Sequence, residues 1–251
     1  MDTLTDRVAI VTGAASGLGR MVAEVLAEAE ISGLTIADVD AAEAEHVAAD
    51  LSQRFSCEAI GSGTDVSKSQ EIEAMVKATV DRFGRIDILV NNAGIAPTIQ
   101  WSEVTEENWR RVMDVNLNGA FLCTLAVLPI MQRQQWGRIV NISSLGAFVG
   151  SVCAHPAYGV SKAGMIAMTK SLAKTYALDN ILVNAIAPGS FDTPLARSFG
   201  EEQIEEFKQA SPLKRQGTPR ELADAVFYLV SNRATYVTGA TLHVNGGALL
   251  V

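Results

Sequence analysis

Short runs of aliphatic and β-branched residues alternate along the whole chain with longer segments of helical period, and this alternation constrains the fold most strongly. Nearly continuous apolar runs are typical of strands buried on both faces of a parallel sheet. Six such runs lie at 8–12, 34–37, 86–91, 138–143, 181–186 and 242–244, and a weaker seventh lies at 58–61. Strand–helix alternation from end to end predicts an α/β fold, a doubly wound parallel sheet with helices on both faces.

Helical segments lie between these runs. Apolar residues recur at helical spacing in 18–29 and 72–83, and capping boxes at Ser67–Gln70 and Thr218–Glu221 predict two helix starts. The longest apolar stretch, 119–131, has 13 residues. It is shorter than the ~20 residues of a membrane-spanning helix, so we expect a buried helix there. Because no break in composition marks a boundary, we expect one domain over 1–251.

Composition excludes several function classes. Of the 251 residues, 48% are hydrophobic and 19% charged, which excludes global disorder. The net charge is −8 without a basic run, so we expect neither nucleic acid nor a membrane as partner. Cys57, Cys123 and Cys153 are widely spaced, and no metal-ligand spacing occurs, so we expect no metal site and no disulfide framework. The acidic N-terminus lacks the apolar core of a signal peptide, so we expect a cytoplasmic protein.

A glycine-rich turn follows the first predicted strand and leads directly into a helix. The turn contains Gly13, Ser16, Gly17, Leu18 and Gly19. Glycines let the backbone approach a pyrophosphate closely, and the helix N-terminus offers free N–H groups to it. These features favour a Rossmann-type dinucleotide-binding fold. The alternative is that the turn is an ordinary strand–helix connection without a ligand.

The spacing of this turn, with motifs further along, resembles one family. Thr12–Gly19 reads TGxxxGxG, Asn91–Gly94 reads NNAG, and Tyr158 and Lys162 form YxxxK. In this order the motifs are similar to those of the short-chain dehydrogenases/reductases, and the resemblance extends over the whole chain. It implies a nicotinamide cofactor and hydride transfer between a secondary alcohol and a ketone.

An acidic residue ends the second predicted strand. Asp38 lies at the distance from the glycine turn at which a carboxylate can accept hydrogen bonds from both ribose hydroxyls of the adenosine. It would repel a 2′-phosphate, so we predict NAD as the cofactor in preference to NADP. Asp40 is the nearby alternative, and a structural turn is the other role open to Asp38.

The resemblance implies further cofactor contacts at the other strand ends. Asp65 and Val66 would flank the adenine, and the NNAG turn would line the ribose side of the groove. The segment after the sixth strand would contact the carboxamide of the nicotinamide. The additional candidates are Asp65, Val66, Asn92, Ala93, Gly94, Pro188, Gly189, Phe191 and Thr193.

Four residues are the catalytic candidates. Tyr158 and Lys162 lie one helical turn apart, so the ammonium is expected to lower the pKa of the phenol and make it a general acid/base. By resemblance, Ser144 would bind the substrate oxygen and Asn116 would hold a water that links Lys162 to solvent. Ser143 and Asn118 are the neighbouring alternatives. Tyr158 and Lys162 would also contact the cofactor.

Substrate identity is not readable from the sequence. The variable segments at 146–155 and about 190–215 would form the substrate site. His155 could touch substrate or lie at the surface, and Phe199, Ile204 and Phe207 could line a lid helix or pack in the core. Gly159 and Gly164 indicate a close neighbour of their helix; we expect a homodimer or homotetramer, with packing inside the chain as the alternative.

Three function hypotheses remain open. The first is an NAD-dependent dehydrogenase acting on a small secondary alcohol or ketone. The second is a ketone reductase of the 3-oxoacyl-carrier-protein type, for which Arg133/Arg138 or Lys214/Arg215 could form a basic docking patch. Asp38 opposes this hypothesis because such reductases usually take NADPH. The third is a non-catalytic NAD-binding sensor, which the full set of catalytic candidates opposes.

Overall fold

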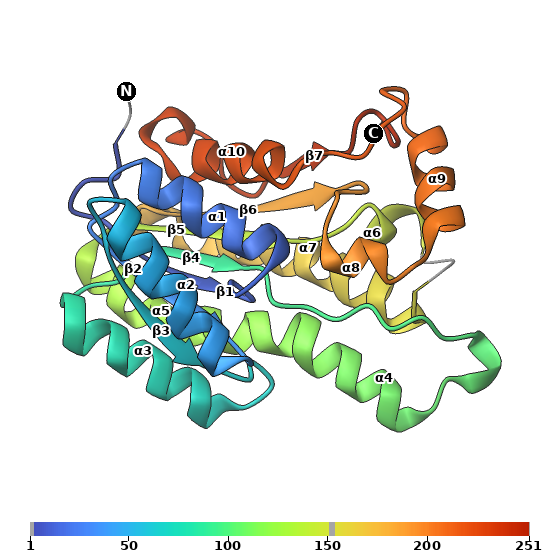
Figure 1. Ribbon diagram of the computed structural model, residues 1–251. Coiled ribbons are helices and arrows are strands. Elements are labelled where there is room, and N and C mark those ends of the chain that lie inside the picture. Colours follow the sequence, from blue (N-terminus) through green and yellow to red (C-terminus); the bar gives the residue numbers. More distant parts are fainter. Residues whose placement is uncertain (1–2, 151–153, 251) are drawn as a thin grey trace.

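One seven-stranded parallel sheet runs through the molecule (Figure 1). The computed structural model describes residues 3–150 and 154–250. The strand order is β3-β2-β1-β4-β5-β6-β7. The strands are β1 Val8–Thr12, β2 Gly33–Asp38, β3 Glu58–Gly63, β4 Ile88–Asn91, β5 Gly137–Ile142, β6 Ile181–Pro188 and β7 Thr241–Val244. Every predicted strand is present within two residues, and the predicted doubly wound α/β fold is confirmed.

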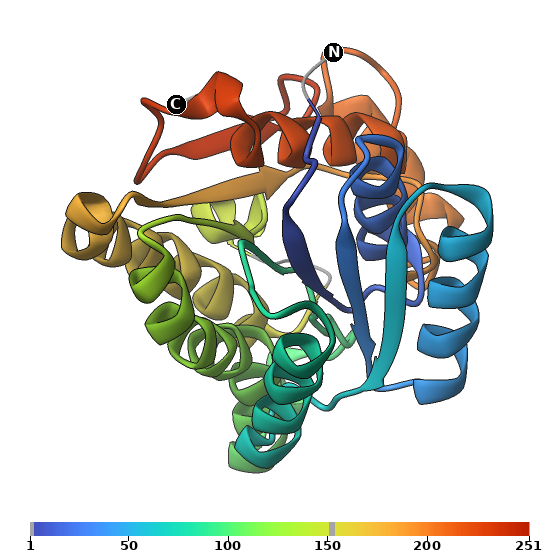
Figure 2. The ribbon, with the colours of Figure 1, turned by 90° about the vertical axis from the view of Figure 1, so that its left-hand side faces the viewer.

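The helices cover both faces of this sheet. They are α1 Gly17–Glu28, α2 Ala41–Arg54, α3 Ser69–Phe83, α4 Glu106–Met113, α5 Gly119–Gln134, α6 Gly146–Val149, α7 Pro156–Tyr176, α8 Pro194–Arg197, α9 Glu201–Ala210 and α10 Pro219–Val230. Short helical turns lie at η1 Trp101–Glu103, η2 Asp114–Asn118, η3 Ala177–Asp179 and η4 Asn232–Ala234. The sheet is thus the middle layer of three, as Figure 2 shows along its edge.

Two hydrophobic cores hold the layers together. Alternate residues of each strand point to opposite faces, so β1 gives Val11 to one core and Ile10 to the other. The first core lies under α1, α2 and α10, and the second lies under α3, α5 and α7. The order reverses between β1 and β4, and at such a switch point the carboxyl ends of the strands leave a crevice for a ligand.

The helix starts test the two predicted capping boxes. At α10 the Thr218 N–H donates to Glu221 Oε2 at 2.8 Å, and the Glu221 N–H donates back to Thr218 Oγ1, as predicted. The box at Ser67 is wrong, because α3 is capped by Lys68 without a side-chain bond. The Ser67 hydroxyl instead donates to Asp65 Oδ1 at 2.7 Å, which closes the turn after β3.

The apolar stretch at 119–131 lies in α5. The continuous helical run Glu106–Gln134 is long and apolar enough to cross a membrane by length and composition, with a mean hydropathy of 1.4 over its best window. Core helices pass the same test. Cys123, Val127 and Met131 of α5 are fully buried in the second core, which accounts for the apolar character of this helix.

Among the described residues, neither a disulfide bond nor a group of metal ligands cross-links the fold. Cys57 and Cys123 are free and buried, and Cys153 lies outside the described residues. Within residues 3–150 and 154–250, no group of three or more His, Cys, Asp or Glu side chains is placed to hold a metal ion.

Candidate active site

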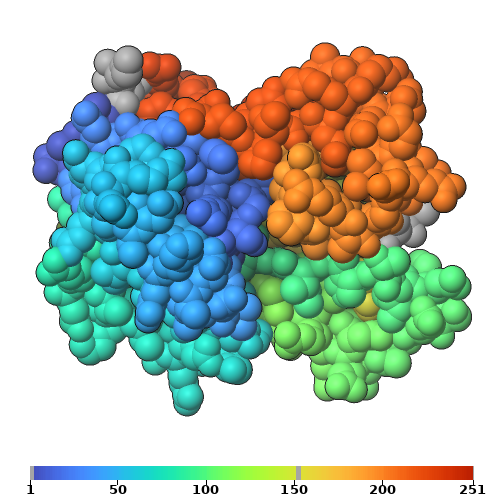
Figure 3. Space-filling view, in the orientation of Figure 1, coloured from blue at the N-terminus to red at the C-terminus, as the bar shows by residue number. Residues whose placement is uncertain are grey.

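A cavity of about 700 Å³ opens at the carboxyl ends of the strands. Figure 3 shows the hollow between the orange segment with α8 and α9 and the green segment with α4. Most of the predicted site residues line it: Gly13, Ser16, Gly17, Leu18, Asp38, Asp65, Val66, Asn92, Ala93, Gly94, Ser144, Tyr158, Lys162, Pro188, Gly189, Phe191 and Thr193. Only Gly19 and Asn116 of the predicted set lie behind this wall.

The glycine turn forms one end of the cavity. Gly13 has a φ of +64°, and a Cβ there would lie 2.8 Å from the Cα of Ala93, so only glycine fits. Gly19 is not part of the cavity wall, but it allows the helix to pack closely on the turn, because a Cβ there would lie 2.2 Å from the carbonyl oxygen of Gly13. Ser16 caps α1 without a side-chain hydrogen bond, which leaves the first N–H groups of this helix free for an anion. The turn therefore fits a pyrophosphate.

Asp38 and Asp40 have different roles. The Ala15 N–H donates to Asp38 Oδ2 at 3.0 Å, so the carboxylate is fixed against the glycine turn at the edge of the cavity. Asp40 caps α2 by accepting from the Glu43 N–H at 3.1 Å. Of the two, only Asp38 is part of the cavity wall.

The NNAG turn divides into a structural and a lining part. The buried Asn91 donates to Thr124 Oγ1 at 3.1 Å and Asn141 Oδ1 at 2.8 Å, and so ties β4 to its neighbours. Asn92 Nδ2 donates to the carbonyl oxygens of Thr12 and Gly13, each at 2.9 Å. The turn thus holds the glycine turn in place and presents its own backbone to the cavity.

Tyr158 and Ser144 meet at the other end of the cavity. Ser144 follows β5 and its hydroxyl hydrogen-bonds to the Tyr158 side chain. The Ser143 hydroxyl instead donates to the Lys162 carbonyl oxygen at 2.8 Å and is buried. The geometry therefore separates the serine doublet into a structural Ser143 and a Ser144 beside the phenol.

Lys162 lies under Tyr158, with its Nζ 5.8 Å from the centre of the phenol ring. Nζ donates to the Ile142 carbonyl oxygen at 2.7 Å. Burial lowers the pKa of Lys162 to about 8. Burial also raises the pKa of Tyr158, although the hydrogen bond from Ser144 opposes this. The expected lowering of the phenol pKa is therefore wrong for the chain by itself, because the loss of solvent around the phenol outweighs the hydrogen bond from Ser144.

Asn116 interrupts a regular helix. It lies in the π-helical turn η2, where its Oδ1 accepts from the Ile95 N–H at 2.8 Å and its Nδ2 donates to the Ile95 carbonyl oxygen at 2.9 Å. A Cβ on Gly94 would meet Asn116 Oδ1 at 3.2 Å and Lys162 Nζ at 3.5 Å, so these polar groups converge there. Asn118 is exposed and bonds to Asp114.

Comparisons with known proteins agree with this geometry. A family model described as enoyl-(acyl carrier protein) reductase matches residues 13–248. The chain is similar to 3-oxoacyl-[acyl-carrier-protein] reductase FabG of Vibrio cholerae, 38% identical over 250 residues and 99% of each chain. It is 40% identical to the FabG of Aquifex aeolicus over 244 residues, 97% of this chain and 98% of the relative. Nodulation protein G of a Rhizobium species is 40% identical over 257 residues, all of both chains.

The chain belongs to the short-chain dehydrogenase/reductase family. It is therefore an oxidoreductase whose cofactor is a nicotinamide dinucleotide. Two of the three relatives named above are ketone reductases by name.

His155 has neither of the two roles expected from the sequence, which were contact with substrate and exposure at the surface. It is fully buried and absent from the cavity wall. Its Nδ1 accepts from the Ala157 N–H at 3.0 Å and caps α7, and its Nε2 contacts Asn108 Oδ1 at 2.9 Å. These contacts require a neutral ring that donates through Nε2, and burial lowers the pKa of His155. The residue anchors α7 to α4.

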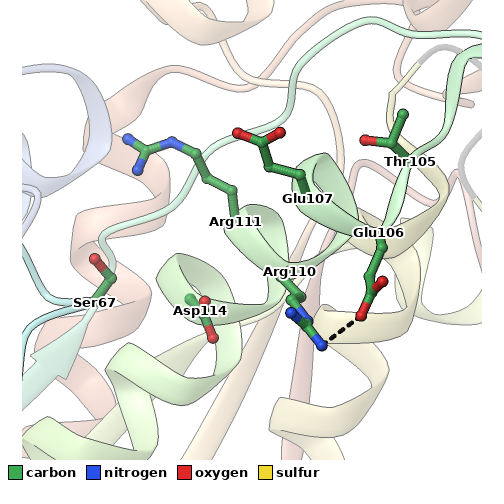
Figure 4. A pocket seen from close by; sticks show the side chains of 7 residues that line it. All are labelled: Ser67, Thr105, Glu106, Glu107, Arg110, Arg111 and Asp114. Carbon is green, nitrogen blue, oxygen red and sulfur yellow. Dashed lines mark ion pairs between the residues drawn. The ribbon is translucent and has the colours of Figure 1, made fainter.

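Sequence reasoning missed Arg111 of α4. It lines the cavity and also a depression of about 590 Å³ beside it. Figure 4 shows Arg111 extended from α4 towards the side of Ser67, while Arg110 pairs with Glu106. The positive charge of Arg111 lowers the pKa of Asp65, although the hydrogen bond from Ser67 is the largest cause of that lowering. The only sequence signal for Arg111 was its position on a helix that follows the NNAG turn.

Most of the remaining wall comes from residues of about 190–215, here called the lid, which include α8 and α9. Phe199 and Phe207 line the cavity, with ring centres 6.2 Å apart in an edge-to-face arrangement. Ile204 is partly buried but is not part of the wall. Leu195 of α8 and Gln203 and Glu206 of α9 complete this side. The other variable segment, 146–155, contributes Gly146, Val149, Gly150 and Ala154 to the wall. Its residues 151–153 lie outside the described residues.

Proposed function

We propose that this protein is an NAD-dependent oxidoreductase that interconverts a small secondary alcohol and its ketone. The observation that carries the proposal is one continuous cavity with Asp38 and the glycine turn at one end and Tyr158, Ser144 and Lys162 at the other. A dinucleotide bound from the glycine turn towards Tyr158 fits the donors and the acid present.

Tyr158 would transfer the proton. In alcohol oxidation the substrate hydroxyl gives its proton to the Tyr158 phenolate oxygen, and the carbinol carbon loses a hydride. The bound nicotinamide supplies the hydride acceptor. The hydroxyl of Ser144, which donates to the phenol when no substrate is bound, would turn its one proton to the substrate oxygen and hold that oxygen in line. Ketone reduction is the same sequence in reverse.

Lys162 and Asn116 would assist from behind the phenol. With a pKa of about 8, Lys162 carries its charge at neutral pH and stabilises the phenolate. The polar groups that converge on Gly94 offer a site for a water between Asn116 and Lys162. In the proposed complex Lys162 would also bind the nicotinamide ribose.

NAD is the proposed cofactor rather than NADP. Asp38 is fixed by the Ala15 N–H and would face the ribose hydroxyls, where a 2′-phosphate would add a like charge. In the described part of the wall the guanidinium of Arg111 is the only one, and it lies near Asp65. The NAD-binding hypothesis thus rests on the carboxylate at the end of β2.

The names of the relatives favour a second candidate, reduction of a 3-oxoacyl group on a carrier protein. Three of the four basic residues that could dock an acidic carrier are engaged elsewhere. Arg138 is buried and bonds to the Asn180 carbonyl oxygen, and Arg215 forms a two-point pair with Glu221. Lys214 donates to the Gln209 carbonyl oxygen at 2.6 Å. These contacts favour a free substrate.

The acidic lid also favours a free substrate. Helix α9 carries Glu201, Glu202, Glu205 and Glu206 against one lysine, Lys208, which contacts Glu205. An acidic carrier would have to approach the cavity over this negative surface. A non-catalytic sensor, the third hypothesis, would not require the Ser144–Tyr158 contact above a buried Lys162.

We also propose a cytoplasmic homo-oligomer, either a dimer or a tetramer. Apolar side chains on the outer helices could contact a second copy of the chain. Phe121 and Leu125 of α5 and Val160 of α7 are nearly half exposed. Gly164 is not evidence for a subunit interface, because its close neighbour belongs to the same chain: a Cβ there would lie 2.7 Å from Leu117. Light scattering on the purified protein measures the oligomeric state directly.

The test of the proposed activity is a panel of secondary alcohols and ketones, free and carrier-linked, each assayed with NAD(H) and NADP(H). We expect turnover of free substrates with NAD(H). Turnover confined to carrier-linked ketones with NADPH would support the second candidate instead. Cofactor binding without any turnover would support the sensor.

A further inference from the structure

The wall of the cavity differs in character along its length. Ionisable groups at the cofactor end are Asp38, Asp65 and Arg111, and those at the reaction centre are Tyr158 and Lys162. The wall beyond the reaction centre is mostly apolar, with Leu145, Val149, Leu195, Phe199 and Phe207. Glu206, which is exposed to solvent at the edge of this wall, is the only ionisable side chain in its described part.

Glu206 is joined to Gln203 on the same helix. Gln203 Nε2 donates to Glu206 Oε2 at 2.7 Å, which uses one carboxylate oxygen and one amide hydrogen. Both side chains line the cavity. Within residues 3–150 and 154–250, Oε1 of Glu206 and Oε1 of Gln203 accept no hydrogen bond, so two acceptors remain for a ligand.

The basic residues of the lid do not neutralise Glu206. Lys208 contacts Glu205 Oε2 at 3.4 Å, and Arg197 pairs with Asp192 at 2.9 Å. Lys214 donates to a backbone carbonyl oxygen. The carboxylate of Glu206 therefore favours a ligand group that donates hydrogen bonds or carries positive charge, and it disfavours an anion.

We propose that Glu206, with Gln203, is the specificity determinant that binds a hydrogen-bond-donating group at the far end of the substrate. The substrate class is then a ketone or secondary alcohol with an apolar body and a distal ammonium or hydroxyl group. The apolar body packs against Phe199 and Phe207 while the reacting carbon lies at Tyr158. This inference rests on the proposed oxidoreductase activity and adds the recognition of the second end of the substrate.

The test uses a homologous series of methyl ketones whose far end carries a methyl, hydroxyl, ammonium or carboxylate group, assayed with NADH. For the wild type we expect kcat/KM to be highest for the ammonium or hydroxyl member and lowest for the carboxylate. Glu206→Gln should lower kcat/KM for the ammonium member about tenfold and raise it for the carboxylate member, because a charge-assisted hydrogen bond and a repulsion are both removed. The methyl member should change little.

Glu205→Gln is the matched control. It removes the same charge from the next position of α9, but Glu205 is not part of the cavity wall and bonds to Gln209 and Lys208. It should leave the ranking of the series unchanged. The same shift in both variants would show a long-range field instead of a contact and would overturn the assignment.

Two further outcomes are distinguishable. A wild-type enzyme that reduces the methyl member as well as the ammonium and hydroxyl members contradicts recognition by Glu206 while leaving the proposed activity intact. Absence of turnover for every member, including the methyl ketone, contradicts the proposed activity itself. Gln203→Leu gives a second variant, with an expected loss of preference for the hydroxyl member over the methyl member.

Discussion

The two halves of the cavity are built in different ways. The cofactor half lies on strand ends and on backbone that has no room to change, as at Gly13, where a Cβ would touch Ala93. The lid half is built from side chains of α8 and α9, which contact the sheet little. We therefore expect the sheet to fix the chemistry and the lid to set the choice of substrate.

The largest expected effect lies where the two halves meet. Tyr158→Phe removes one hydroxyl and should lower kcat by roughly 10²–10⁴-fold, because general acid/base catalysis contributes about that much. Binding of NADH and thermal stability should stay near wild type. Steady-state rates beside a cofactor titration test this. A variant that keeps a tenth of the wild-type kcat would remove Tyr158 from the proton-transfer role.

A lid change should act on the substrate and not on the cofactor. Phe207→Ala removes one ring of the edge-to-face pair with Phe199, and a partly buried ring contributes about 1–2 kcal/mol to packing. We expect KM for the ketone to rise about tenfold and the Tm to fall by a few degrees, with the Kd for NADH unchanged. Phe207→Leu should give a smaller rise. An equal loss of NADH affinity would mean that the two halves are not independent.

A change in the scaffold should act on stability. Gly164→Ala puts a Cβ 2.7 Å from Leu117 Cδ2, next to the π-turn that holds Asn116. The end of the Leu117 side chain must move to relieve this contact, so after the ~1 kcal/mol that Ala gains in a helix we expect a small net loss of about 1 kcal/mol. Thermal unfolding measures this, and adding Leu117→Ala should restore part of the loss. A higher Tm for Gly164→Ala would contradict the tight packing.

The smallest effect concerns pH. The pKa of His155 is lowered from 6.5 by burial, so the unfolded chain binds a proton more readily than the folded one. Stability should therefore fall as pH decreases through 6.5 towards the lower folded value. His155→Asn keeps a capping side chain without titration and should show a flatter Tm profile between about pH 7.5 and about pH 5.5.

His46→Asn is the control for this profile. His46 is exposed on α2, where it contacts Glu43, so its replacement should leave the slope close to wild type. An unchanged slope in His155→Asn would show that the buried ring is not the titrating group.

The sequence predicted the strand-end residues well because their constraints are local. A positive φ at Gly13 or a carboxylate at the end of β2 follows from a few neighbouring residues. The lid was less predictable, since the spacing of Phe199 and Phe207 does not say whether the rings face core or cavity. Gln203, Glu206 and Arg111 were missed because polar residues on an amphipathic helix usually face solvent, and the sequence pattern does not show that these three also border a cavity.

Two errors have a different physical origin. His155 next to Pro156 reads as a loop residue, yet its side chain is a cap enclosed by α4, which depends on contacts distant in sequence. The Tyr158–Lys162 spacing predicted a lowered pKa for the phenol, but spacing carries no information on burial, which raises the pKa of the phenol. Burial depends on the whole fold and is not visible in a motif.

The central claim is tested most directly by the ratio of kcat/KM for NADH to that for NADPH on one ketone. A 2′-phosphate facing Asp38 loses one hydrogen-bond donor and meets a like charge, which costs several kcal/mol. We expect the wild type to prefer NADH by at least about a hundredfold. Asp38→Ser should remove most of this preference, and Asp40→Ser should keep it, because Asp40 caps α2. Equal use of the two cofactors by the wild type would contradict the role of Asp38 and favour the carrier-protein reductase instead.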